Sequence, residues 1–366
     1  MLPFINAFIH VGKFDESMSR LLYLNVQQLS HLYRRGSFVT HLLGIFLNIA
    51  AIPLLVKSLA HPLASVPDHV QHRFYARNLL RAYALCLTWS PLEVMVSTSV
   101  DALGVKYHQI FIVMFLLAVL FLGLDWFIFT HGKDHDIQVQ PSAQLSVESA
   151  DMKKHVVHLI GFLFLFVVAV HIVDHWTGQG FLFSIVLSIL PFSLISSALM
   201  GKSKQYLRIA LSFWKSRTGN LASYFFMFLS AGFFVETLSQ TPWLLTLQKY
   251  LASYTDQTLL IYLLVGGYFV VTSLIGFHPL VSLALLLSIM DPFINELASV
   301  SLALVMIGSS LATVMYSPFN VSVSVLSDLI RVHPFQITVQ NIGFALVYVM
   351  VTILSAYLTH WLYATW

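Results

Sequence analysis

Apolar residues fill long windows of this chain and rarely alternate with polar ones, which favours helices over strands. The windows are residues 38–56, 78–104, 108–130, 156–175, 180–200, 219–237, 257–277, 279–291, 297–331 and 335–362. Most reach the ~20 residues that a helix needs to cross a bilayer. The pattern predicts an all-α integral membrane protein, a polytopic helical bundle of about nine to eleven membrane segments.

Two of these windows are interrupted by the same polar motif. Residues 89–101 return 227 positions later as residues 316–328, and nine of 22 positions are identical when the match is extended to 110 and 337. Weaker matches at offsets of 220 and 226 extend the similarity toward the N-terminus. We therefore expect a first membrane repeat at 1–130 and a second at 219–366, joined by a cytoplasmic linker (131–155) and by connecting spans with a basic loop (156–218). The sequence leaves parallel and inverted repeats open.

Each repeated motif begins with Ser followed by Pro, at Ser90-Pro91 and Ser317-Pro318. Ser is favoured at the N-cap of a helix and Pro at its first position, and Glu93 would complete a capping box. Both motifs lie at the depth of apolar sequence, where free N–H groups require a partner or a water-filled cavity. The motifs predict interrupted or re-entrant helices.

A polar residue follows every four positions after each Ser-Pro pair, which places these residues on one helical face. They are Glu93, Ser97 and Asp101 in the first copy, and Asn320, Ser324 and Asp328 in the second. Helix N-termini favour anions, while hydroxyl, amide and carboxylate oxygens can hold Na⁺ or H⁺. We expect a paired substrate and ion site in which Asp101 and Asp328 act as coupling acids. The alternative is a pair of Pro-kinked helices with structural caps.

Two further groups of polar residues are candidates for the same site. Arg73, Arg77 and Arg81 form one helical stripe, either a vestibule that gathers anions or a cytoplasmic helix end whose side chains reach the headgroups. His278 lies at a predicted helix break beside Pro279, where it could relay a proton or serve as a hydrogen-bonded packing residue.

His171, Asp174 and His175 support a competing class, a membrane-embedded metal-dependent enzyme, although a catalytic metal needs a third protein ligand. A non-transporting membrane subunit is the third alternative. The chain has no Walker-type loop, nucleophile elbow or Cys-x-x-Cys motif. We therefore expect no enzyme and no cofactor beyond a coupling ion.

Composition agrees with a membrane location. The chain of 366 residues is 58% apolar and only 10% charged, whereas soluble domains are about a quarter charged. Its net charge of +3 is small and dispersed, so no nucleic-acid partner is expected. Residues 201–217 contain five basic residues and no acid, which places them in the cytoplasm of a multi-pass cell-membrane protein. By the same rule 174–180 faces outward.

The tetrapeptides Ser90-Pro91-Leu92-Glu93 and Ser317-Pro318-Phe319-Asn320 resemble the tips found in secondary carriers of the ion-transporter superfamily. The resemblance implies two repeats, typically inverted, whose interrupted helices or re-entrant hairpins meet at a substrate and cation site. The expected function is ion-coupled secondary transport of a small, anionic solute. The expected partners are that solute and the lipid bilayer, with a homodimer as one assembly.

Overall fold

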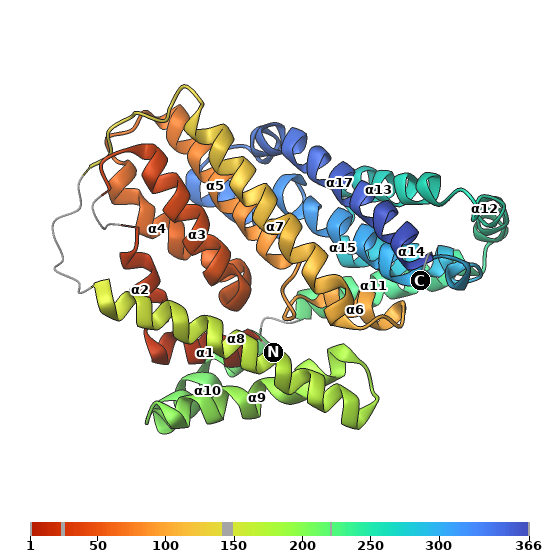
Figure 1. The fold of residues 1–366 in the computed structure, drawn as a ribbon, viewed down its shortest axis with the longest axis horizontal. Coiled ribbons are helices and arrows are strands. Elements are labelled where there is room, and N and C mark those ends of the chain that lie inside the picture. The colour runs from red at the N-terminus through yellow and green to blue at the C-terminus, as the bar shows by residue number, and fades with distance from the viewer. Residues whose placement is uncertain (1, 23–25, 141–148, 220–221, 365–366) are drawn as a thin grey trace.

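The computed structural model describes residues 2–22, 26–140, 149–219 and 222–364, and all regular structure in these ranges is helical (Figure 1). The protein is an all-α polytopic helical bundle, as predicted. Six stretches of the described residues are long and apolar enough to cross a membrane. They are Leu29–Leu63, Tyr107–Thr130, Lys154–Thr177, Phe181–Leu199, Ser299–Ile330 and Pro334–Trp361. The higher predicted number included helices that are too short for a full crossing.

The same succession of helices occurs twice. The first repeat contains α1 (Leu2–Gly12), α2 (Phe14–Arg20), α3 (Leu29–Leu47), α4 (Ala51–Leu63), α5 (Asp68–Leu87), α6 (Val94–Ala102) and α7 (Tyr107–Thr130). The second contains α11 (Ala222–Ser239), α12 (Pro242–Ala252), α13 (Thr258–Leu274), α14 (Pro279–Met290), α15 (Ser299–Tyr316), α16 (Val321–Ile330) and α17 (Pro334–Ala364). Helices α6 and α16 start 227 residues apart, as do α7 and α17, so the offset seen in the sequence is kept at these helix starts.

Helices α3 and α4 form a re-entrant hairpin. The amide of Val139 donates to the carbonyl of Gln27 before α3 (3.0 Å), and the next amide, of Gln140, donates to Pro62 near the end of α4 (3.2 Å). The two ends therefore lie side by side, and the chain reverses near Asn48, which has left-handed backbone geometry (φ 51°). The predicted single helix at 38–56 is wrong, because the reversal falls inside that apolar window.

Helices α13 and α14 form the corresponding hairpin of the second repeat. The Tyr268 hydroxyl donates to the carbonyl of Ser282 (2.9 Å). These residues would be about 21 Å apart along a continuous helix, so the chain must reverse between them. Gly276 lies in the turn with φ 102°, a conformation that L side chains rarely adopt.

The predicted helix breaks at Ser90 and Ser317 are both present, but the predicted caps are wrong. The N-caps of α6 and α16 are Glu93 and Asn320, three residues later than expected. The amide of Ser317 still bonds to Thr313 of the preceding helix (2.8 Å), and that of Asn320 closes a turn onto Ser317 (3.0 Å). The serine thus ends one helix and starts a turn, so the predicted capping box with Glu93 at the third position does not form.

The two repeats are inverted with respect to each other. The ring of Phe121 on α7 packs edge-on against Tyr348 of α17, with centroids 4.9 Å apart. Further along α7, Asp125 binds Arg81, which in turn binds Asn341 of α17. Residue numbers thus rise along α7 where they fall along α17, so the two equivalent helices are antiparallel (Figure 1).

The repeats are connected by α8 (Ser149–Thr177), α9 (Phe181–Leu199) and α10 (Ser203–Gly219). The predicted basic loop is therefore a helix, and Lys202 just before it donates to the carbonyl of Val11 in α1 (3.0 Å). The predicted linker is shorter than expected, because 149–155 belongs to α8 and 135–140 bonds to the open ends of the first hairpin. Its central part, 141–148, lies outside the described residues.

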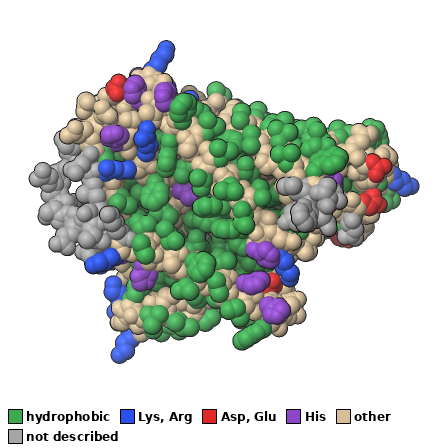
Figure 2. Space-filling model, in the orientation of Figure 1, with side chains coloured by type: hydrophobic (Ala, Val, Ile, Leu, Met, Phe, Trp, Pro, Cys, Tyr) green, Lys and Arg blue, Asp and Glu red, His purple; other side chains and the backbone are tan. Residues whose placement is uncertain are grey.

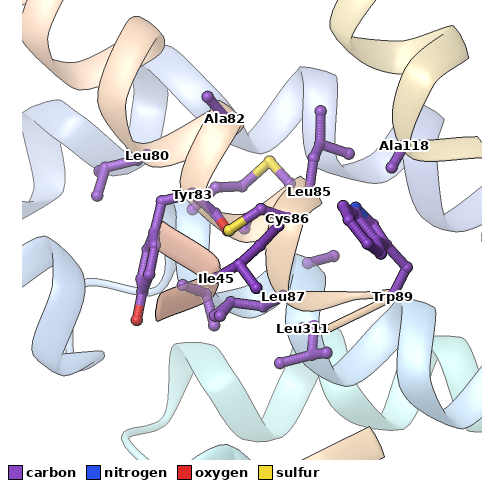
Figure 3. Close-up of a cluster of buried hydrophobic side chains, with 14 of the residues drawn as sticks. Ile45, Leu80, Ala82, Tyr83, Leu85, Cys86, Leu87, Trp89, Ala118 and Leu311 are labelled. Atoms are coloured by element: carbon purple, nitrogen blue, oxygen red, sulfur yellow. The ribbon is translucent and has the colours of Figure 1, made fainter. Parts of the chain in front are cut away.

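The broken helices pack together near their breaks. Leu311 of α15 lies beside Leu85, Cys86 and Leu87 of α5 in one buried cluster (Figure 3). The outer surface carries many apolar side chains, and Lys and Arg are found mainly along the left side of the view in Figure 2. The apolar outer surface matches a protein surrounded by lipid.

Candidate functional site

In the first repeat, the tip of the hairpin bonds to the helix break. The side-chain amide of Asn48 donates to Glu93 Oε2 (3.3 Å) and accepts from the hydroxyl of Tyr83 on α5 (2.6 Å). The backbone amide of Ile49 also donates to Asn48 Oδ1 (2.7 Å). Among the described residues no Lys, Arg or His forms an ion pair with Glu93. The first break thus presents a carboxylate held by a neutral donor.

In the second repeat, hydroxyl groups join the tip of the hairpin to the helix break. Ser317 Oγ donates to the carbonyl of Ser273 at the end of α13 (2.7 Å), and the Ser273 hydroxyl lies 3.0 Å from that of Tyr316. Asn320 Oδ1 accepts from both the backbone amide (3.1 Å) and the hydroxyl (2.9 Å) of Ser322. Every one of these groups is uncharged.

The hairpins also connect the two repeats. The second arm of the first hairpin, α4, packs against α16, and the second arm of the other hairpin, α14, packs against α6. Each hairpin therefore contacts the break of its own repeat and the short helix of the opposite repeat. The two breaks and the two hairpins form one assembly in the interior of the molecule.

The predicted serines of the first break are buried and bonded locally. Ser90 Oγ accepts from the amide of Leu92 (3.3 Å), and Ser97 Oγ donates to the carbonyl of Glu93 (3.1 Å). Pro91 and Pro318 lie buried in the two turns, and Ser324 is half-buried. Of the predicted polar stripes, Glu93 and Asn320 lie at the breaks themselves.

The structure does not place the repeated acids Asp101 and Asp328 at the breaks, contrary to expectation. Asp101 accepts from the amides of Phe181 (2.6 Å) and Leu182 (2.9 Å), so it caps α9, whose N-cap is Gly180 and has no side chain. Asp328 is exposed. Eight residues of helix span about 12 Å, so an acid in that position lies at the far end of the short helix, away from the break.

Two of the three arginines in the predicted stripe form ion pairs. Arg73 pairs with Asp134 of the linker (2.9 Å), and the half-buried Arg77 follows it. Arg81 is buried and pairs with Asp125 on α7 (2.6 Å). Asp125 was missed by the sequence reasoning, although a single acid within the apolar window 108–130 was a usable signal.

His278 serves as a hydrogen-bonded structural residue, the second of the two roles considered for it. It is the N-cap of α14, and its Nδ1 accepts from the amide of Leu280 (3.2 Å). Asn48, Tyr83 and Ser273 were also missed. Asn48 is the one polar residue in the run 42–56, and that signal could have located the first tip.

The alternative metal site is not assembled in the part of the chain that the structure describes. His171 lines a cavity of about 470 Å³ together with His108 and Asp174. The two imidazole centroids are 6.1 Å apart, and His175 is exposed on the same helix. No group of three or more His, Cys, Asp or Glu among the described residues is placed to hold a metal ion.

Comparison with known proteins gives no assignment, because no protein-family model and no curated protein matches the chain.

Proposed function

We propose that the protein is an ion-coupled secondary transporter of the cell membrane that moves a small, anionic solute with Na⁺ or H⁺. The observation that carries this proposal is that, in each of two inverted repeats, the tip of a re-entrant hairpin bonds to the break of an interrupted helix. Inverted repeats can exchange conformations, which opens a site between them to either side of the membrane in turn. Irregular backbone at membrane depth is tolerated where it is buried in protein or lines a cavity.

The two breaks differ in charge, which suggests different roles. Glu93 supplies the carboxylate, and its counterpart Asn320, 227 residues later, is neutral. A carboxylate with neutral partners can hold a coupling cation or proton. At the second break, the first turn of α16 contributes backbone N–H groups and partial positive charge, which favour an anion. We assign the coupling ion to the first break and the solute to the second.

The test begins with a thermal-shift screen of the purified protein against sulfate, phosphate and mono-, di- and tricarboxylates in Na⁺ and K⁺ buffers. The anion that stabilises the protein most is then followed in proteoliposomes under imposed Na⁺ and H⁺ gradients. We expect Glu93→Gln to reduce gradient-driven uptake at least ~10-fold, equivalent to about 1.4 kcal/mol in the barrier to transport, while the anion still stabilises the variant. Asp328→Asn, which neutralises an exposed acid, is the matched control.

A second pair of variants separates the two roles. Ser317→Ala and Asn320→Ala should weaken anion-induced stabilisation, because they alter the second break, and should leave the choice of coupling ion unchanged. Wild-type gradient dependence in Glu93→Gln would overturn the assignment of the coupling ion. If no anion stabilises the protein in either buffer, the proposal that the transported solute is an anion is overturned.

A further inference from the structure

A charged pair lies buried in the helix bundle away from both breaks. Arg81 Nη1 donates to Asp125 Oδ1 at 2.6 Å, and the side chains are only 6% and 2% exposed. The hydroxyl of Tyr33 on α3 donates to the other carboxylate oxygen (2.7 Å). Charges at this depth are costly and are retained where they have a specific role.

The pair reaches from the first repeat into the second. Arg81 Nε donates to Asn341 Oδ1 (2.9 Å), and Nη2 donates to the carbonyl of Gln340 (2.8 Å). The guanidinium also lies 4.4 Å from the ring centroid of Phe344. All three of these residues are on α17. Asn341 in turn donates to the carbonyl of Ala76 on α5 (3.1 Å).

The equivalent positions of the second repeat meet without any charge. Adding 227 to 81 and to 125 gives Gly308 and Thr352. These residues touch, because a Cβ atom at Gly308 would lie 2.5 Å from Thr352 Cγ2. The contact between the two helices therefore does not require an ion pair. What the charged pair adds in the first repeat is its set of bonds to α17.

The bonding of the pair argues against a second ion site. Both oxygens of Asp125 and all three nitrogens of Arg81 have partners. We infer that Arg81, Asp125, Tyr33 and Asn341 form an inter-repeat lock. The lock fixes α17 on α5 and α7 and sets the register of the antiparallel pair α7 and α17. This inference is independent of the proposed transport activity.

The lock is tested on the full chain by the midpoint of thermal unfolding in one detergent. Arg81→Gln and Asp125→Asn each leave one buried charge without its partner, so each should lower the midpoint by roughly 5–10 °C. The double variant should lose clearly less than the sum of the two. The matched control is the partly exposed pair Arg73 and Asp134, where Arg73→Gln should shift the midpoint by no more than ~2 °C.

A further variant tests the connection between repeats. Asn341→Leu should lower the midpoint more in the wild-type protein than in the Arg81→Gln background. In the wild-type protein the substitution also removes the hydrogen bond from Arg81 to Asn341. Equal losses in the two backgrounds would overturn the lock and confine the pair to the first repeat. Additive losses for Arg81→Gln and Asp125→Asn would also overturn it. If a single variant fails to fold, recovery of folded protein in the double variant still supports the pairing, and no recovery contradicts it.

Discussion

Residues with the same spacing have different environments in the two repeats. Glu93 and Asn320 are equivalent in sequence and both cap a short helix after a break. Asp101 and Asp328 are also equivalent and both are exposed, yet it is Asp101 that accepts the amides at the start of α9. The difference arises because α9 follows only the first repeat, and the two backbone amides at its start donate hydrogen bonds to Asp101. Identity of a residue between repeats therefore does not establish identity of role.

The cap at α9 gives a prediction for Asp101. Replacing it with Ala should destabilise the protein by ~1–2 kcal/mol, because two amides at the start of α9 lose a charged acceptor. The thermal midpoint of Asp101→Ala measures the loss, and Asp328→Ala serves as the repeat-related control with little expected change. An unchanged midpoint for Asp101→Ala, or a loss of gradient dependence in its uptake at normal stability, would contradict the structural role.

Some helices approach one another closely at glycine residues. Gly44 of α3 lies against Cys86, where an added Cβ would be 2.6 Å from the sulfur atom. Gly308 of α15 lies against the stiff, β-branched Thr352 on α17. Small residues allow close packing of membrane helices, which otherwise lack a hydrophobic force between them. The first hairpin and the helix α15 are therefore positioned by the absence of a side chain.

Gly308→Ala should destabilise the protein by ~1–3 kcal/mol, because the new methyl group overlaps Thr352 and the helices must separate. Gly267→Ala on α13 is the control, since its Cβ would meet nothing within 4 Å. That control should be neutral or stabilising by up to ~1 kcal/mol, as Ala is the better helix former. Equal thermal midpoints for the two variants would show that the contact between α15 and α17 accommodates an added methyl group without loss of stability.

For the whole molecule, inversion places the open ends of the two hairpins on opposite sides. The open end of the first hairpin adjoins the linker, through the bond from Gln140 to Pro62, and basic residues gather there. From the charge rule we propose that this end faces the cytoplasm. The second hairpin, related by the inversion, opens toward the other face of the membrane.

Cysteine labelling in intact cells tests this topology. Cys86 is the sole cysteine and is buried, so Cys86→Ala provides the background. Ala64→Cys follows the first hairpin and Asp291→Cys follows the second, and both positions are exposed. We expect a membrane-impermeant maleimide to label Asp291→Cys from outside and Ala64→Cys only after permeabilisation. Labelling of both from the same side would contradict the placement of the two hairpin openings on opposite faces of the membrane.

The sequence by itself determined the helical membrane class, the two repeats and the positions of the broken helices. Long apolar windows allow little besides helices in a bilayer, because backbone polar groups must be satisfied within the segment. A tetrapeptide with Ser and Pro repeated at a fixed offset located both breaks. These features are local, so periodicity and turn chemistry were sufficient to predict them.

Tertiary structure alone decided which polar residues meet. The linker bonds to both open ends of the hairpin that reverses at Asn48, and the capping of α9 by Asp101 joins residues 80 positions apart. The pairing of Arg81 with Asp125 and Asn341 connects three helices of two repeats. Hydrogen bonds and ion pairs act over a few ångströms, so they follow the packing of distant segments. A single sequence carries no direct signal of that packing.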